Sequence, residues 1–353
     1  MSKIAAVIED SFRKKVKKAG IRNAYLLVCS EKKGINMSIA EGKTGAAAPD
    51  PRQPVHMASV GKLFTSVIIS MLYERGLLDF SDKIAKYLEP GLMKGLHIYK
   101  GTDYSGEIEI RHLLKQTSGL NDVFYVLYEK ILKEKKSYTP EDAVIWGKEN
   151  LKPKSKPGAG HFYTDTNYYL LGMIAEKITG KHFHELLHEM IFDPLGMDNS
   201  CMYGYSQPRV KPEVPAAGLY IRGTNLLEVP GLFSIDFSGG GIIAPPADYL
   251  KFMRGLVHGK LIKKETLDRM INDDAAMGPA RPGMHYGYAV WKFTPVPILI
   301  PKKLSCWGCV GVTGAFMFYH PETDSYIIGS FNDMSTIYWA LGFMLGKIIR
   351  PLL

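Results

Sequence analysis

Residues 56–62 read His56-Met57-Ala58-Ser59-Val60-Gly61-Lys62, and the apolar helix that we predict from Val60 to Arg75 begins inside this stretch. One helical turn separates Ser59 from Lys62, so their side chains lie on the same face of the helix. A lysine amine in that position can take the serine proton and make the hydroxyl a nucleophile. Taken alone, the pattern equally suits a serine that only caps the helix.

The same Ser-x-x-Lys spacing occurs twice more, at Ser11–Lys14 and at Ser30–Lys33. Ser11 falls on the polar side of an amphipathic helix predicted over residues 3–18, and Ser30 opens a hairpin turn. Ser59 instead follows a proline-rich extended segment and lies at the positive end of an apolar helix. Ser59 is therefore the nucleophile that the sequence favours.

A second candidate element is Tyr163-Thr164-Asp165, which is the one Tyr-x-Asp or Tyr-x-Asn triplet in the sequence. A tyrosine beside an ammonium group can relay a proton, because positive charge favours the phenolate. The same residues would also suit the start of a helix, with Asp165 or Thr166 as its cap and Tyr163 in the core.

Taken together, several segments carry a resemblance to a known family. They are residues 56–62, the segment Ile110-Arg111-His112-Leu113-Leu114-Lys115-Gln116-Thr117-Ser118-Gly119-Leu120, residues 157–169, and Phe237-Ser238-Gly239-Gly240-Gly241-Ile242 followed by Asp248. In order and spacing they resemble the class C beta-lactamases and their relatives: DD-peptidase-like penicillin-binding proteins, family VIII esterases and D-amino-acid amidases. The resemblance covers the chain from about residue 20 onward. It implies a covalent acyl-enzyme on Ser59, with Lys62 and Tyr163 moving the proton.

The third motif of that family departs from its usual form here. The family carries Lys-Thr-Gly or His-Thr-Gly on the strand beside the site. The matching stretch reads Cys309-Val310-Gly311-Val312-Thr313-Gly314-Ala315-Phe316, so Cys309 and Val310 replace the cation and the threonine. A literal Lys43-Thr44-Gly45 precedes Ser59 at the end of a hairpin, and its order and context argue against a role.

The resemblance implies an oxyanion hole made by the N–H groups of Ser59 and Val312. Main-chain donors need no particular side chain, so this function survives the altered motif. We assign Cys309, Gly311, Val312 and Asp165 to the oxyanion and substrate-binding side of the site. What the altered motif lacks is a side chain that grips a substrate carboxylate.

Asp165 stands where the family more commonly has asparagine. An ionised Asp165 favours the ammonium form of Lys62, and we then expect Lys62 to lower the pKa of Tyr163, which becomes the base. A buried, protonated Asp165 would instead mimic the amide. The sequence leaves both options open.

The order of predicted elements indicates one sheet built from both ends of the chain. A hairpin is predicted at Ala24–Cys29 and Ile35–Ala40, and strands at Tyr288–Phe293, Ala315–Tyr319 and Tyr326–Ser330. Helices predominate between them. We therefore expect an α/β fold of the α+β type, an antiparallel sheet flanked by helices, as the resemblance to the beta-lactamase and DD-peptidase fold also implies. Residues 1–79 and 236–353 would form the α/β domain, and residues 80–235 a helical insertion with a lid-like loop at 203–235 over the site.

Composition excludes several classes of protein. The 353 residues are 46% hydrophobic and 22% charged, which is typical of a globular chain. The net charge of +9 is scattered, and no basic stretch is interleaved with aromatics, so we expect no nucleic-acid partner. The sequence contains neither a signal-peptide pattern nor an apolar run of the ~20 residues that a membrane span needs. We expect a cytoplasmic protein without membrane insertion.

Cys306-Trp307-Gly308-Cys309 spells Cys-x-x-Cys. A zinc site wants four ligands, and no second pair has suitable spacing, so we expect no metal and no other cofactor. A thioredoxin-like role needs the pair at the start of a helix, and that context is missing. Reversible oxidation of the two thiols stays open.

We therefore expect a serine hydrolase acting on small esters, amides or lactams, esterase-like and with weak beta-lactamase activity. The alternative is a non-catalytic or slowly turning-over protein of the same fold that binds penicillin or D-amino-acid peptides, which the altered third motif favours. A redox or zinc protein built on Cys306 and Cys309 ranks third. The sequence does not set the oligomeric state.

Overall fold

The computed structural model describes residues 2–42, 48–297 and 300–353. The triplet Lys43-Thr44-Gly45 lies outside the described residues.

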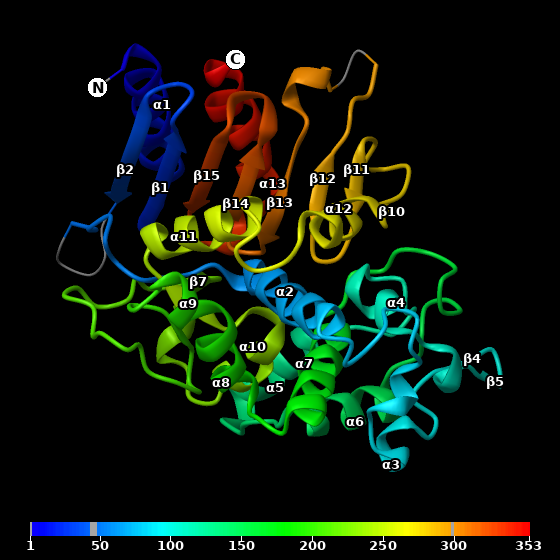
Figure 1. The fold of residues 1–353 in the computed structure, drawn as a ribbon. Helices are drawn as coiled ribbons and strands as arrows, with labels where there is room; N and C mark the ends of the chain where they lie inside the picture. The colour runs from blue at the N-terminus through cyan, green and yellow to red at the C-terminus, as the bar shows by residue number, and fades with distance from the viewer. Residues whose placement is uncertain (1, 43–47, 298–299) are drawn as a thin grey trace.

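One antiparallel sheet organises the described chain, with strand order β10-β11-β12-β13-β14-β15-β1-β2. Its strands are β1 Asn23–Ser30, β2 Ile35–Gly42, β10 Ala275–Ala276, β11 Met284–Tyr286, β12 Trp291–Phe293, β13 Cys306–Gly311, β14 Ala315–His320 and β15 Ser325–Ser330. The N-terminal hairpin joins the C-terminal strands through β1, where Leu27 faces Ile328 of β15. Both ends of the chain therefore build the same sheet, and the predicted fold class is confirmed (Figure 1).

Within residues 2–42, 48–297 and 300–353, three smaller sheets lie outside the main one. They are formed by β3 Val55–His56, β9 Ile242–Ala244 and β6 Cys201–Met202, by β4 Ile98–Tyr99 with β5 Thr102–Asp103, and by β7 Tyr220–Ile221 with β8 Thr224–Asn225. In the first of these, His56 pairs with Ile243. This pairing ties the residues that precede Ser59 to the segment that follows Gly239 to Gly241.

The helices pack on the sheet or around the central helix α2. They are α1 Lys3–Ala19, α2 Gly61–Glu74, α3 Pro90–Met93, α4 Ile110–Leu114, α5 Phe124–Glu134, α6 Pro140–Asn150, α7 Thr166–Thr179, α8 Phe183–Leu187, α9 Asp193–Leu195, α10 Phe233–Gly240, α11 Pro246–Val257, α12 Lys264–Asn272, α13 Ile337–Phe343 and α14 Arg350–Leu352. In Figure 1, α3 to α10 gather on the far side of α2 from the sheet. No helix in the described ranges has the length and hydropathy to cross a bilayer.

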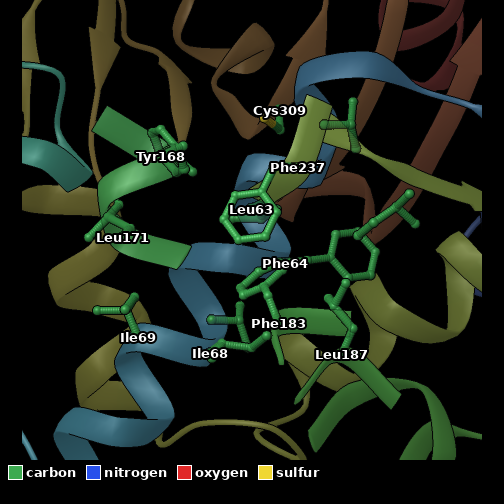
Figure 2. Packing of buried hydrophobic residues seen from close by; sticks show 14 of the residues in the cluster. Leu63, Phe64, Ile68, Ile69, Tyr168, Leu171, Phe183, Leu187, Phe237 and Cys309 are labelled. Atoms are coloured by element: carbon green, nitrogen blue, oxygen red, sulfur yellow. The ribbon is translucent and has the colours of Figure 1, made fainter. Parts of the chain in front are cut away.

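Two apolar cores occupy the two faces of the sheet. Strand β1 alternates between them, because Leu26 and Val28 pack with α1 and the C-terminal helices, whereas Leu27 and Cys29 pack toward α2. Helix α2 is buried almost all round, as expected of an internal helix. Figure 2 shows its residues Leu63, Phe64 and Ile68 among side chains of α7, α8 and α10. Helix α2, which carries Lys62 and directly follows the turn with Ser59, is thus packed against other elements on several sides.

The predicted loop 203–235 has more structure than its proline content suggested. It contains the β7–β8 hairpin, whose turn is Arg222-Gly223 with positive φ at both residues, and α10 begins at Phe233. Arginine is not among the residues favoured in such turns, so the hairpin carries no sequence signal. The division into domains 1–79 with 236–353, and 80–235, stays a prediction.

Candidate active site

Ser59 lies in a short 3-10 turn, Ala58–Val60, that leads into α2. No side chain caps the start of that helix, so the alternative of Ser59 as a simple N-cap is wrong. Ser59 is half-buried and lines a cavity of about 420 Å³. The cavity walls are Ala58, Ser59, Asp122, Phe124, Tyr125, Tyr163, Asp165, Asp236, Gly239, Arg281, Met284, Trp291, Val310, Gly311, Val312, Ile337, Tyr338 and Leu341.

The amine of Lys62 is completely buried and fully hydrogen-bonded. Its Nζ donates to Ser59 Oγ at 3.0 Å, to the Gly239 carbonyl oxygen at 2.7 Å, and to the Asp165 carboxylate. These contacts use the three donors of an ammonium group. An ammonium that donates to Oγ stabilises negative charge on the serine oxygen, but it cannot also accept the serine proton.

Tyr163 approaches the same serine from the second motif. The Lys62 amine lies 5.1 Å from the centre of the Tyr163 ring, and Tyr163 lines the same cavity as Ser59. Burial, followed by the charge of Asp165, raises the pKa of Tyr163 well above its ordinary value, and the nearby Ser59 side chain opposes this only in part. The expectation that Lys62 would lower this pKa is therefore wrong, since desolvation outweighs the nearby cation.

Two neighbouring carboxyl groups have raised pKa values. Burial is the main cause for Asp165, with the Lys62 ammonium acting against it. Burial and the charge of Asp165 raise the pKa of Asp122 to about 6. Asp122 accepts a hydrogen bond from the backbone N–H of Asp165 at 2.8 Å, so the two groups form one unit beneath the cavity.

The segment 110–120 of the resemblance holds the second motif in place. Gln116 donates to the carbonyl of Thr164 at 3.0 Å and accepts from the Thr164 N–H at 3.0 Å. Ser118 donates to Asn167 at 2.6 Å. These bonds fix the backbone between Tyr163 and Asp165 and the start of α7 just after them, which explains why the segments 110–120 and 157–169 occur together.

The glycines at the end of α10 allow the backbone to approach the nucleophile. A Cβ on Gly240 would lie 3.1 Å from the Ala58 carbonyl oxygen, and one on Gly239 would lie 2.9 Å from Asp165 Oδ1. A Cβ on Gly61 would lie 2.8 Å from the Gly240 carbonyl oxygen. Only glycine fits this crossing, which brings the Gly239 carbonyl to Lys62.

Val310, Gly311 and Val312 line the cavity from β13 and the turn after it. Cys309 is buried, and its Sγ lies 3.4 Å from the carbonyl oxygen of Ser59. Burial raises the pKa of the Cys309 thiol to about 12, so the thiol is neutral. The third motif therefore presents no charged side chain to a substrate.

Cys306 and Cys309 do not form a pair. They are three residues apart on β13, which puts them on opposite faces of the strand. Cys306 packs in the core under α1 and Cys309 in the core around α2. This geometry rules out reversible oxidation of the two thiols to one disulfide. Within the described ranges no three His, Cys, Asp or Glu side chains gather as metal ligands.

The cavity walls come partly from elements to which the sequence assigned no role. Asp122 and Tyr125 at the start of α5, Arg281 before β11, and Tyr338 on α13 all line it. The loop 203–235 supplies none of the lining residues named above and lines a second hollow of about 840 Å³ instead. Asp122 had one local signal, because it follows the segment 110–120 by two residues. Tyr338 had none.

A serine hydroxyl bonded to a buried lysine amine at the wall of a cavity is an arrangement found in serine enzymes that react through an acyl intermediate. The chain belongs to the Beta-lactamase family, whose family model matches residues 8–338. The chain thus shares a serine-hydrolase fold family with amidases and acyltransferases.

Relatives are distant and their names differ. Penicillin-binding protein 4* of Bacillus subtilis (strain 168) is 31% identical over 157 residues, which are 44% of this chain and 32% of that protein. Monacolin J acid methylbutanoyltransferase of Aspergillus terreus (strain NIH 2624 / FGSC A1156) is 23% identical over 343 residues, covering 87% of this chain and 80% of the relative. The D-amino acid amidase from Ochrobactrum anthropi SV3, complexed with L-phenylalanine, superposes with a TM-score of 0.78 at 19% identity over 99% of this chain and 98% of that one. The last comparison shows the fold alone.

Proposed function

We propose that this protein hydrolyses small uncharged esters or amides through a covalent acyl-enzyme on Ser59. The observation that carries the proposal is the arrangement around the nucleophile: Lys62 Nζ lies 3.0 Å from Ser59 Oγ and 5.1 Å from the centre of the Tyr163 ring, and Tyr163 lines the same cavity as Ser59. If Ser59 served only in packing, it would not need beside it, at an open cavity, the buried ammonium group of Lys62 with all of its donors bonded.

The proposed mechanism uses Tyr163 as a relay. Ser59 Oγ attacks the substrate carbonyl carbon while its proton passes to the Tyr163 oxygen, and the Tyr163 proton passes to the leaving alcohol or amine. Tyrosine stays neutral before and after the step, which agrees with its raised pKa. The Lys62 ammonium stabilises the developing charge on Oγ, and the N–H groups of Ser59 and Val312 would hold the oxyanion.

Deacylation reverses the relay with water in place of the leaving group. Water attacks the acyl carbon, its proton passes through Tyr163, and Ser59 Oγ is reprotonated as the acid departs. Lys62 keeps its proton throughout. No resident metal or organic cofactor enters these steps.

The cavity lining supports uncharged substrates. Aromatic and aliphatic walls such as Phe124, Trp291 and Leu341 suit an apolar acyl group, and Val310, which replaces the family's threonine at this wall, cannot donate a hydrogen bond to a carboxylate. Lactams, which carry a carboxylate, would react weakly. Because one structural neighbour is a D-amino acid amidase, amino-acid amides should be among the substrates tested. The carboxylates of Asp122 and Asp236 at the cavity wall would suit the ammonium group of such a substrate.

Intact-mass measurement after treatment with a fluorophosphonate, together with turnover of p-nitrophenyl acetate, tests the proposal. We expect one adduct on Ser59 and ester hydrolysis that the Ser59→Ala variant abolishes while its thermal unfolding is unchanged. An adduct without turnover would favour the alternative, a binding protein that forms a stable acyl adduct. Turnover by Ser59→Ala within a few-fold of the parent chain would point to another nucleophile.

A further inference from the structure

The buried imidazole of His56 contacts two different segments of the site. Its Nδ1 accepts a hydrogen bond from the Ala58 N–H at 3.1 Å. Its Nε2 lies 3.1 Å from Oδ2 of Asp236, close in distance but bent away from a straight hydrogen bond. Because Nδ1 accepts from an N–H, the ring proton sits on Nε2, which is the ring nitrogen on the side of the Asp236 carboxylate.

The bond to Ala58 acts on the backbone that carries the nucleophile. Ala58 has φ +49, a left-handed conformation that costs a residue with a side chain about 1–3 kcal/mol. Such a conformation persists only where its surroundings hold it. Ala58 directly precedes Ser59, whose own N–H is the proposed oxyanion donor, so the Ala58 turn sets the direction of that donor.

The contact to Asp236 reaches the element that holds Lys62. Asp236 lies in α10 just before a kink at Phe237, where φ is +29. Beyond the kink, the Ser238 carbonyl accepts from Thr65 at 2.6 Å and the Gly239 carbonyl accepts from Lys62 at 2.7 Å. His56 therefore lies between the turn that presents Ser59 and the helix end that anchors Lys62.

We propose that His56 and Asp236 form a positioning pair, which fixes the Ala58 turn against α10 and thereby aligns Ser59 with Lys62 for acylation. His56 is 2% exposed and is not among the cavity-lining residues given above, so it acts through its neighbours rather than on substrate. The inference rests on the proposed acyl-enzyme function. It assigns roles to two residues that the motifs around Ser59, Tyr163 and Cys309 leave unexplained.

Two substitutions separate the two contacts. The amide oxygen of His56→Asn lies near the position of Nδ1 and keeps an acceptor for the Ala58 N–H, whereas the amide nitrogen of His56→Gln reaches the position of Nε2 and keeps only the donor to Asp236. His320→Asn is the matched control, because His320 is equally buried and both its ring nitrogens are paired, at 2.7 Å to Thr323 and 2.8 Å to the Lys303 carbonyl.

We expect His56→Gln to lower kcat on p-nitrophenyl acetate about 10–100-fold with KM within about three-fold, since small misplacements of reacting groups cost about that much. The rate of fluorophosphonate labelling of Ser59 should fall in parallel. His56→Asn, which keeps the Ala58 bond and loses the contact to Asp236, should recover only part of the rate, and Asp236→Asn, which keeps an acceptor oxygen near Nε2, should lie between His56→Asn and the parent chain. His320→Asn should leave kcat within about two-fold even if it lowers the unfolding temperature.

Each labelling rate is divided by the folded fraction of the variant, which is measured by the amplitude of thermal unfolding. A variant that is partly unfolded is then not mistaken for one with a misaligned site. Equal kcat for the parent chain and His56→Gln would overturn the pair while leaving the acyl-enzyme proposal intact. Equal losses in Asn and Gln variants, or a loss in KM alone, would also overturn it. A parent chain with neither turnover nor a Ser59 adduct would overturn both proposals.

Discussion

Replacing Asp122 by asparagine should make the protein more stable at neutral pH and leave its stability unchanged in acid. Asp122 accepts hydrogen bonds from the Asp165 N–H at 2.8 Å and from the Thr164 hydroxyl at 3.2 Å. An asparagine oxygen can accept both bonds, so the substitution removes the charge and, apart from it, mainly the interaction of the second carboxylate oxygen with the Phe124 backbone. Burial and the neighbouring Asp165 raise the pKa of Asp122 to about 6.

The size of the effect follows from this pKa. The pKa of an aspartate in the unfolded chain is about 3.9, so folding raises the pKa of Asp122 by about two, which corresponds to about 3 kcal/mol of unfolding free energy. Between pH 4 and 6 the folded state binds more protons than the unfolded state, and its stability therefore falls as the pH rises. Above pH 6 the full cost is present. The variant lacks this cost.

Urea unfolding at pH 4 and pH 8 measures the difference. We expect the variant to be more stable by up to about 3 kcal/mol at pH 8 and equal to the parent chain at pH 4. Asp10→Asn, on the surface with Lys14, serves as control and should show no such pH-dependent gain. A variant that is less stable at pH 8, or equally changed at both values, would refute the reasoning. A stability gain paired with reduced turnover would mark Asp122 as a group retained for the site.

Two further predictions concern the chemistry. Tyr163→Phe removes only the relaying hydroxyl and should lower kcat about 10²–10⁴-fold with little change in fold; a change within a few-fold would give the proton transfer to Lys62 and Asp165 instead. Cys309→His with Val310→Thr restores a carboxylate grip worth about 1.5–3 kcal/mol, which should raise kcat/KM for beta-lactam acylation about ten- to a hundred-fold and affect neutral esters far less. Efficient cephalosporin turnover by the unmodified chain would show that another cation already does this, and Arg281, which lines the cavity, would be the first to test.

Much of the fold follows from local patterns. The β1–β2 hairpin and the apolar α2 were both predicted from hydrophobic periodicity and from the positions of proline and glycine. The structure also brings Ser59, Lys62 and Tyr163 together as the motif spacing suggested, because one helical turn and one cradled loop suffice to do so.

The electrostatics of the site were harder to predict. The sequence shows which residues carry charge but not how deeply they are buried, and on charge alone Lys62 was expected to lower the pKa of Tyr163. In the structure this pKa is raised, because burial of the tyrosine is the largest effect on it. His56 and Asp236 are 180 residues apart and carry no local signal of their contact. Arg222 and Lys211 of the predicted lid are not among the residues given for the cavity wall: Arg222 pairs with Glu129 at 3.0 Å, and Lys211 lines the other hollow.

We propose that the two departures from the family pattern act on substrate choice in the same direction. Cys309 stands where the family has a cation beside the nucleophile, and Asp165 stands where asparagine is commoner, next to the buried Lys62 ammonium. Asp122 and Asp236 bring two further carboxyl groups to the cavity wall, which also carries the guanidinium of Arg281. The carboxyl groups would make the potential around Ser59 more negative, so an anionic substrate would lack the family's partner in the third motif and depend on Arg281 instead. Restoring the third motif alone would leave Asp165 in place, and we therefore expect only a partial recovery of beta-lactam chemistry.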